Sequence, residues 1–586
     1  MKKYLSAVIS NIYLRIKESE YTYLSLIAFI VGTLAGVGAI VFSYLIELFQ
    51  WIFFGHGEEL YLLIKDEPLY KKILIPTIGG AIVGPIIYFY AREAKGHGVP
   101  EVMSAVALKG GVIRKRVVAI KALVSAITIG SASSVGSEGP IVQIGAALGS
   151  NIGQSLNFSG SRMKSLVACG AAGGIAAIFN APIAGVMFAV EIIIGDVGFS
   201  TFGPLIISAV TATVISRGWW GDVPVLKVPQ NEMVSTLEIP AYILLGIAAA
   251  FIAFLYTKLL YKTEDFFEEK VKIPEYIKPA IGGFLVGLIG LLSPHIYGVG
   301  YYTIDLTLID NLPFSLLFAL IFIKIIATSI SLGSGSSGGI FAPSLFIGAV
   351  MGGAFGKIAH GLFPAVSSSA GAYALVGMGG VVAGATYAPI TAIMIIFEMT
   401  SDYKLIIPLM LTCITSAIFA SHLSKESIYT MKLARAGINL KEGKEVNILK
   451  SILVKDARSS TIKTIPENMT IRGLNEYMAK GKHSNFPIVD KDGLLTGIIS
   501  FQDFKDAVLE KDLEDLIVVK ELATKNVITI TDDKNLDDAL MMIGSRNIEQ
   551  LPVVDKNNPR KIIGMLSRRD IISAYNKGLL KNRLGE

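Results

Sequence analysis

Three motifs that combine glycine and proline interrupt the apolar part of this sequence: GHGVP at 96–100, GSEGP at 136–140 and GIFAP at 339–343. In each motif the proline suits the first turn of a helix, where its missing N–H group costs nothing. A helix start presents unpaired N–H groups and about half a positive charge, which favours a dehydrated anion without a basic side chain. Several converging starts could hold an anion weakly enough to release it. Alternatively, these glycines only allow close helix packing, as small residues do in membranes.

Glu138 lies inside the second motif, between Ser137 and Gly139. The hydropathy of the surrounding sequence places it at membrane depth, where a carboxylate costs about 2.5–3.5 kcal/mol on insertion scales. A carboxylate at an anion site can occupy the site when it is ionised and leave when it is protonated. The sequence therefore predicts that Glu138 is a proton-linked gate.

The segments that must position these motifs occur twice, at one constant offset. The matching positions are Lys121 and Lys324, Gly136 and Gly339, Pro140 and Pro343, Gly145 and Gly348, and Gly149 and Gly352. A second block, API at 181–183 followed by Glu191, matches API at 388–390 followed by Glu398. Inverted halves of transporters often hold their substrate at the interface between the repeats, near the bilayer midplane. The duplication therefore predicts the site at this interface.

Composition places most of the chain in lipid. The 586 residues are 52% hydrophobic and only 17% charged, whereas about a quarter of the residues of a soluble protein are charged. Apolar runs fill residues 23–420, and charged residues accumulate after residue 440. Several runs are shorter than the roughly 20 residues that cross a bilayer. Together with the 59 glycines, these short runs predict broken or re-entrant helices.

Basic residues between 92 and 116 predict that these connections face the cytoplasm. The formal net charge of +6 gives no case for a nucleic-acid partner. Cys169 and Cys413 have no histidine or further cysteine at metal-ligand spacing, so we predict no metal site and interpret both as packing residues.

From about residue 447 the sequence changes to short alternating strands and helices, which also repeat. The two copies are FPIVD at 486–490 with GIISFQD at 497–503, and LPVVD at 551–555 with GMLSRRD at 564–570. Ser500 and Asp503 in the first copy correspond to Ser567 and Asp570 in the second. A hydroxyl and a carboxylate at a strand-to-helix turn suit a polyol, but the same residues are ordinary helix caps.

The motifs, in the order in which they occur along the chain, resemble those of the CLC family of chloride channels and chloride/proton antiporters. The resemblance covers essentially the whole chain. The resemblance includes FNAPIAGVMFAVE at 179–191 and IYTMKLAR at 428–435, and the tail is similar to a tandem pair of CBS domains. It implies a homodimer with one pore per subunit and a duplicated membrane domain in inverted orientation. It also implies an integral membrane location, in the cell membrane, with cytoplasmic CBS domains.

The resemblance makes Glu138 the gating glutamate and places the amides of Ile340 and Phe341 at the central anion. Tyr429 matches the family tyrosine whose hydroxyl closes the inner side of that site, although an interfacial tyrosine is the alternative. Lys121 matches an intramembrane lysine that raises the local positive potential. The predicted anion-binding residues are His97, Gly98, Ser137, Gly139, Ile340, Phe341 and Tyr429.

The chain departs from the family pattern at three positions. His97 stands where the first motif usually has serine; it could donate an N–H when neutral, attract an anion when protonated, or line a wet vestibule without touching the ion. Ser137 stands where the second motif usually has arginine. Ile192 follows Glu191 where family antiporters have a second, proton-relaying glutamate. Family channels have an apolar residue there, so the sequence favours a passive channel, and the alternative is a chloride/proton antiporter with His97 or water as the inner proton path.

In CBS domains the repeated motif can bind the phosphate and ribose of an adenine nucleotide. This role carries over to Ser500, Asp503, Ser567 and Asp570. Neither copy has a P-loop lysine motif, and residues 23–420 cannot supply a soluble catalytic barrel, so we predict no enzyme. A cation channel with a CBS sensor would use acidic rings rather than glycine- and proline-rich helix starts.

The predicted fold is an α-helical polytopic membrane domain with an inverted internal repeat and broken helices, followed by an α/β tandem CBS domain. The expected parts are a cytoplasmic N-terminal segment (1–22), a CLC transmembrane anion-transport domain (23–436), a linker (437–446) and two CBS domains (447–510 and 511–580). We expect chloride as the transported ion and the CBS domains as an adenine-nucleotide-sensing module.

Overall fold

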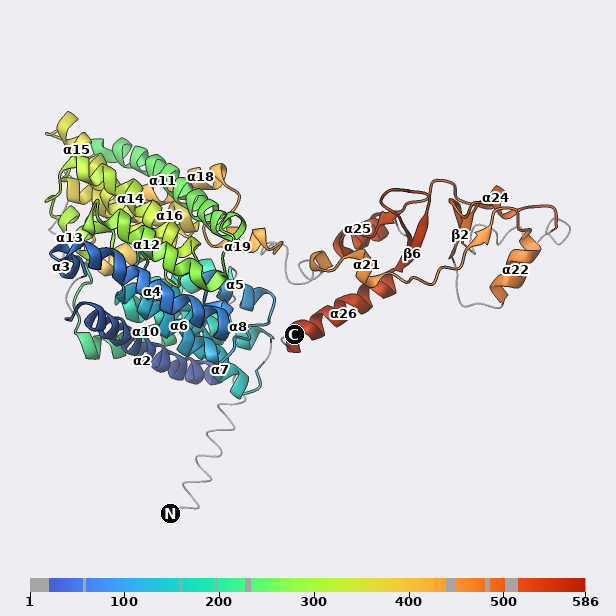
Figure 1. Ribbon diagram of the computed structural model, residues 1–586, viewed down its shortest axis with the longest axis horizontal. Helices are drawn as coiled ribbons and strands as arrows, with labels where there is room; N and C mark the ends of the chain where they lie inside the picture. Colours follow the sequence, from blue (N-terminus) through green and yellow to red (C-terminus); the bar gives the residue numbers. More distant parts are fainter. Residues whose placement is uncertain are drawn as a thin grey trace, which may run out of the picture. The chain divides into compact units, whose positions relative to one another are not determined.

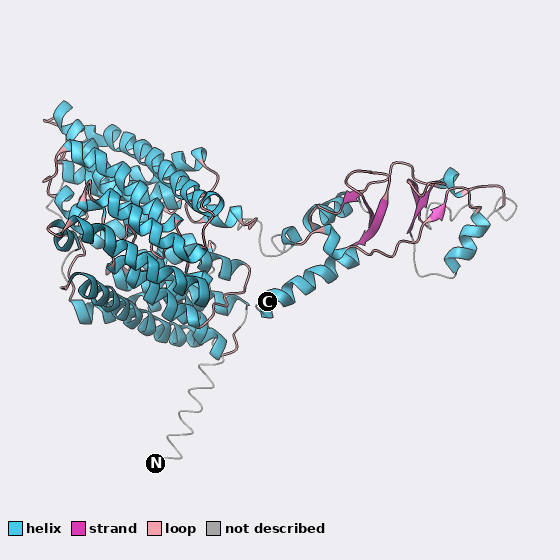
Figure 2. Cartoon of the chain, in the orientation of Figure 1, coloured by secondary structure: helices cyan, strands magenta, loops and turns pink. Residues whose placement is uncertain are grey.

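The computed structural model describes residues 20–55, 60–158, 160–195, 199–226, 233–438, 449–479, 485–500, 515–546 and 548–584. The chain forms two compact units, Met1–Ala434 and Arg435–Glu586. The described part of the first unit is built from helices, whereas the second combines helices with two small sheets (Figure 1, Figure 2). This division confirms the predicted fold class.

The first half of the helical unit contains α2 (Glu20–Phe54), α3 (Leu60–Lys65), α4 (Leu69–Tyr90), α5 (Val99–Ala107), α6 (Arg116–Gly130), α7 (Glu138–Ser155), α8 (Gly160–Phe179), α9 (Pro182–Phe188) and α10 (Phe199–Trp220). The second half contains α11 (Ile239–Asp265), α12 (Lys278–Gly290), α13 (Tyr301–Leu308), α14 (Phe314–Gly333), α15 (Phe341–Leu362), α16 (Ala370–Thr386), α17 (Pro389–Thr400), α18 (Ile406–Leu423) and α19 (Thr430–Arg435).

Helix length varies widely within this unit. Among the described residues, seven helices are long and apolar enough to cross a membrane, and several other apolar helices are shorter. The short helices α5 and α9 begin with a proline in their first turn, as expected where a chain restarts a helix. The prediction of broken helices is therefore confirmed.

A two-fold relation between the halves is visible where equivalent residues meet. Gly136 and Gly339 exchange backbone hydrogen bonds of 2.9 and 2.6 Å, so the axis passes between them. Ser125 Oγ lies 2.8 Å from Ser337 Oγ, and the pair that corresponds to it in the other repeat is also in contact, at 3.1 Å. Reciprocal contacts of this kind are the property of an isologous interface.

Helices α4 and α12 show that the repeat is inverted. Gly80 of α4 packs on the Pro279 carbonyl and Gly84 on the Tyr276 carbonyl, so the residue number rises along one helix as it falls along the other. Gly283 of α12 makes the reciprocal contact with α4. A two-fold axis that relates two antiparallel helices is perpendicular to them. Because α4 is long enough to span a membrane, the two-fold axis of the repeat lies in the membrane plane.

The second unit repeats one topology. Its sheets contain β1 (Ile465–Pro466), β2 (Asn485–Val489) and β3 (Leu495–Ser500), and β4 (Ile530–Thr531), β5 (Gln550–Val554) and β6 (Ile562–Ser567). In each sheet the first pair of strands is parallel and the second antiparallel, with the same irregularity in register. Helices α21 (Val454–Ala457), α22 (Ile471–Ala479), α24 (Val519–Leu522), α25 (Leu536–Arg546) and α26 (Arg568–Leu584) complete the described part of the unit. Each copy has its own apolar core.

Candidate functional site

The three motifs meet at the interface of the repeats. Gly98 precedes α5 with φ +78°, a backbone conformation that favours glycine, and a Cβ on it would lie 2.9 Å from the Gly139 carbonyl oxygen. A Cβ on Gly139 would lie 3.1 Å from Cα of Gly339 and would also collide with the His97 carbonyl. The structure therefore brings the starts of α5, α7 and α15 into backbone contact, which only glycine permits.

Glu138 is the first residue of α7, and its carboxylate reaches across to α15. The side chain is 1% exposed. Its Oε2 accepts a hydrogen bond of 3.3 Å from the Ala342 N–H, and its Oε1 one of 3.4 Å from the Ser137 hydroxyl. Within the described part of the chain, the N–H groups of Ile340 and Phe341 beside this carboxylate have no hydrogen-bond partner. The unpaired N–H groups of Ile340 and Phe341 and the ionisable carboxylate of Glu138 are therefore buried together in one space at the start of α15.

His97 and Tyr429 lie together on the other side of this space, both buried, with ring centroids 5.9 Å apart. His97 Nε2 lies 3.5 Å from Tyr261 Oη, and the Tyr261 hydroxyl donates to the Ile428 carbonyl at 2.7 Å. Because the Tyr261 proton is used in this way, Nε2 must be the donor. Nδ1 has no partner among the described residues, and in the neutral imidazole it carries a lone pair. His97 therefore has a second N–H to offer only when it is protonated.

Lys121 holds the loop that leads into α5. It is 0% exposed, and its Nζ donates to the carbonyls of Ala94 and Gly96 at 3.0 and 2.8 Å. Lys324 holds the two carbonyls before α13 in the same way, at 2.9 and 2.8 Å. Each lysine therefore satisfies the acceptors of a broken helix connection, in addition to the positive potential predicted for Lys121.

Glu191 and Ile192 lie in a one-turn π-helix, Ala189–Ile194, that follows α9. The Glu191 carboxylate accepts hydrogen bonds from the N–H groups of Ile390 and Thr391 and from the Thr391 hydroxyl, at 3.1, 2.7 and 2.6 Å. Glu398 caps the start of α9 in the same way. Glu191 is thus a cap of α17, and Ile192 is a buried apolar side chain.

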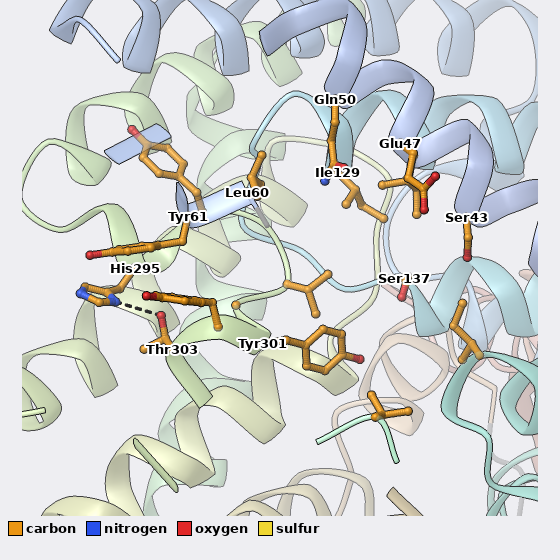
Figure 3. Close-up of a pocket in the computed structure, with 17 residues that line it drawn as sticks. Ser43, Glu47, Gln50, Leu60, Tyr61, Ile129, Ser137, His295, Tyr301 and Thr303 are labelled. Carbon is orange, nitrogen blue, oxygen red and sulfur yellow. Dashed lines mark hydrogen bonds between the residues drawn. The ribbon is translucent and has the colours of Figure 1, made fainter. Parts of the chain in front are cut away.

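A cavity of about 480 Å³ lies on the Ser137 side of the site (Figure 3). Figure 3 shows Ser43, Glu47 and Gln50 of α2 on one wall and residues of the second half on the other. Its lining residues are Ser43, Ile46, Glu47, Gln50, Leu60, Tyr61, Ile129, Ser137, Ile178, Val225, His295, Tyr297, Val299, Gly300, Tyr301, Tyr302 and Thr303. No lysine or arginine is among these described residues, and Glu47 is the one carboxylate.

This cavity, which we call the vestibule, has an aromatic wall. The Tyr61 ring stacks on His295 and on Tyr302, with centroid distances of 4.5 and 4.8 Å, and His295 Nδ1 lies 2.9 Å from the Thr303 hydroxyl. Sequence reasoning missed the vestibule, because much of its lining comes from α2, α3, the start of α13 and the loop before α13. The one available signal was a carboxylate, Glu47, inside an apolar run.

The tail contains a cavity of about 610 Å³ between its two repeats. It is lined by Ser459, Thr461, Lys463, Asn485, Phe486, Pro487, Ile548, Glu549, Gln550, Met565, Ser567, Arg568, Arg569 and Asp570. The Ser567 hydroxyl and N–H donate to Asp570 Oδ2 at 2.6 and 2.9 Å, and the Asp570 N–H donates back to Ser567 Oγ at 3.2 Å. This is a reciprocal cap of α26. Ser500 is not part of the lining, and Asp503 lies outside the described residues.

Comparisons with known proteins match both units. A family model described as voltage gated chloride channel matches residues 79–421, and one described as CBS domain matches 454–510 and 519–577. The chain is 35% identical over 413 residues to a putative chloride channel protein ClcB-like of Ralstonia nicotianae, covering 70% of this chain and 96% of that protein. It is 31% identical over 423 residues to the H⁺/Cl⁻ exchange transporter ClcA of Salmonella arizonae, covering 70% and 88%.

Two solved structures share the fold. A slow cyanobacterial Cl⁻/H⁺ antiporter matches with a TM-score of 0.64 at 26% identity, over 70% of this chain and 97% of that one. A eukaryotic CLC transporter matches with a TM-score of 0.62 at 18% identity, over 93% of this chain and 97% of that one. The second match extends into the tail and shows likeness of fold alone.

We predict that the vestibule is reached by water. Ser43→Cys should react with a membrane-impermeant thiol reagent, because Ser43 lines the cavity. Ser125→Cys should not react, because Ser125 is fully buried, and the native Cys169 and Cys413 are buried as well and give a low background. Mass spectrometry of the labelled protein in liposomes measures both rates. Equal labelling of the two variants would contradict an open vestibule.

Proposed function

The chain belongs to the voltage gated chloride channel family, and we propose that it carries chloride passively through a pore that the Glu138 carboxylate opens and closes. The observation that carries this proposal is the position of that carboxylate at the start of α15, beside the unpaired N–H groups of Ile340 and Phe341. The same donors suit a dehydrated chloride ion, because N–H groups at a helix start favour a negative charge. The chain is an integral membrane protein, and its role is transport rather than catalysis.

The gate follows from competition for these donors. Ionised Glu138 places a negative charge where chloride would bind, so the two exclude each other. Protonation removes the charge, weakens the hydrogen bond from the Ala342 N–H and releases the side chain. Gly98 and Gly139 allow the backbones to approach around the ion, and Ser137 supplies a hydroxyl at the entrance from the vestibule. Tyr429 closes the inner side.

We predict that Glu138→Gln removes most of the pH dependence of chloride flux. The amide keeps the size of the side chain but cannot ionise, so flux at neutral pH should rise to the level that the natural protein reaches at acid pH. Chloride efflux from liposomes across a pH series measures this. Glu67→Gln, a carboxylate in a loop ion pair with Lys71, is the control and should leave the profile unchanged. A Glu138→Gln variant that kept the natural pH profile would remove Glu138 from the gate.

Passive flow is favoured by the residues near the inner end of the path. Coupled exchange must return protons to Glu138 from the cytoplasmic side, and Ile192 cannot carry them. Its neighbour Glu191 accepts three hydrogen bonds as the cap of α17, so its carboxylate is already committed to the fold. No direct carboxylate path to Glu138 is therefore present at this position.

Chloride/proton exchange is the second candidate, because relatives of the chain are named exchangers. Proton return would then need His97, whose unpaired Nδ1 can accept a proton. A protonated His97 would also attract chloride. Binding of the anion and the proton would then be linked at this one side chain.

An imposed chloride gradient distinguishes the two mechanisms. For a passive channel we predict no uphill proton movement, and a reversal potential set by chloride alone. Simultaneous chloride and proton recording from reconstituted protein measures both. Protons moved at a fixed ratio to chloride would overturn the channel assignment. In that case His97→Ser should abolish proton movement and leave chloride flux, which would identify the imidazole as the relay.

We further propose a homodimer with one pore per subunit. The membrane unit exposes apolar side chains on α10 and α18, including Val214 and Ile418, which a second copy or lipid can cover. The proposed oligomer follows the resemblance, and the pore residues named above all belong to a single chain.

The tail is proposed to bind an adenine nucleotide in the 610 Å³ cavity, on the cytoplasmic side. Asp570 keeps one carboxylate oxygen, Oδ1, outside the cap of α26, where it can accept from ribose hydroxyls. Lys463, Arg568 and Arg569 line the same cavity and suit phosphate groups. Ser567 contributes to the proposed nucleotide site by holding Asp570 in the cap of α26. In the first copy, Ser500 and Asp503 remain proposed ligands of the nucleotide.

Calorimetry of ATP binding to the full chain tests this role. Asp570→Asn retains an oxygen for the cap but loses the charge, so we predict at least tenfold weaker ATP binding with an unchanged unfolding temperature. Asp533→Asn, elsewhere in the tail and paired with Lys556 at 2.8 Å, should bind ATP normally. If the natural protein gives no binding heat at millimolar ATP, the cavity is not a nucleotide site.

A further inference from the structure

Tyr256 of α11 has a buried hydroxyl that the function described above does not use. The side chain is 0% exposed, and its Oη has no hydrogen-bond partner among the described residues. A phenol buried without a partner is costly, and tyrosine hydroxyls usually find one when they are buried. Tyr261, further along the same helix, shows the usual arrangement, because its hydroxyl donates to the Ile428 carbonyl.

The surroundings of Tyr256 place it beside the anion path. Ala253, one turn before it, packs on α16 at Gly384, where a Cβ would lie 3.1 Å from the Ala253 Cβ. The next residue of α16, Ala385, accepts a 2.8 Å hydrogen bond from the N–H of Ile428, which directly precedes Tyr429. The ionisable groups that interact electrostatically with the Tyr256 hydroxyl are Tyr429, Glu138 and Tyr261.

Several hydrogen-bond donors converge at this site. The hydroxyl of Tyr256 and the N–H groups of Ile340 and Phe341 make no hydrogen bond within the described part of the chain, and Tyr429 lies at the same site. The carbonyls nearby are occupied, by Lys121 at Ala94 and Gly96 and by Tyr261 at Ile428. The Glu138 carboxylate accepts from the neighbouring Ala342 N–H and not from these donors, and in the proposed mechanism it leaves when the gate opens.

We propose that Tyr256 is a ligand of the inner anion site, where its hydroxyl donates a hydrogen bond to the chloride held between the start of α15 and Tyr429. The assignment rests on the proposed transport of chloride through this site. It gives the site two phenolic donors, from α11 and from the segment before α19. Tyr261 is a positioning residue, because it orients His97 and fixes Nε2 as the donor.

The test compares two tyrosine-to-phenylalanine changes on one helix. Tyr256→Phe removes only the hydroxyl and should weaken chloride binding at least tenfold, as expected for a lost hydrogen bond to a charged group. Tyr242→Phe is the matched control: Tyr242 is also fully buried, but it lies about 21 Å away along α11 at 1.5 Å per residue and stacks on Tyr373 at 4.8 Å. It should bind chloride as the natural protein does.

Calorimetric titration of the purified full chain with chloride measures the affinities, and unfolding temperatures check that both variants fold. Equal chloride affinity of Tyr256→Phe and the natural protein would overturn the role of Tyr256 and leave the proposed transport intact. Absence of chloride binding by the natural protein would instead overturn the anion site itself.

A second measurement does not depend on a variant that folds. Crystals of the natural full chain soaked in bromide should show an anomalous peak within hydrogen-bond distance of Tyr256 Oη. A bromide peak that contacts Tyr429 and the α15 start but lies beyond reach of Tyr256 would overturn the assignment.

Discussion

Broken helices inside a membrane leave backbone groups that lipid cannot satisfy, and the organisation of this site follows from that constraint. Each interruption exposes carbonyl oxygens at one helix end and N–H groups at the next helix start. Lys121 and Lys324 donate to the carbonyls on the two sides of the repeat interface. The N–H groups of Ile340 and Phe341 are left unpaired. Because these carbonyls already accept hydrogen bonds and these N–H groups do not donate any, the helix start suits an anion or the Glu138 carboxylate.

The scaffold is two-fold symmetric, but its chemistry is not. The backbones of Gly136 and Gly339 pair across the axis, and Glu191 and Glu398 cap opposite helices in the same manner. Glu138 itself has no acidic counterpart, because Phe341 occupies the equivalent position of the second repeat. A symmetric frame therefore supplies helix starts on both sides, and the proposed response to protons rests on a single side chain.

The two ends of the path also differ in their side chains. The vestibule is lined by hydroxyls, an aromatic stack and the Glu47 carboxylate, with no lysine or arginine among the described lining residues. The other end holds Lys121 and the imidazole of His97. Lys432, which pairs with Glu101 at 3.2 Å, lies close to them. Along the proposed path, the Ser137 end therefore carries one carboxylate and the His97 end carries lysines.

The sequence by itself determined the membrane unit, the duplication, the three helix starts and the carboxylate among them, because each depends on hydropathy, glycine and proline spacing, or a repeated pattern along one chain. It also separated the α/β tail, whose two copies share strand register. The sequence could not reveal that Glu191 caps α17, that Tyr261 fixes the donor nitrogen of His97, or that the buried Tyr256 hydroxyl has no partner among the described residues. Only the tertiary structure decided these points, because hydrogen bonds and burial depend on contacts between residues far apart in the sequence, and such contacts leave no periodic signal. The vestibule has the same origin, since α2, α3, the start of α13 and the loop before it line the cavity only after the two halves have packed together.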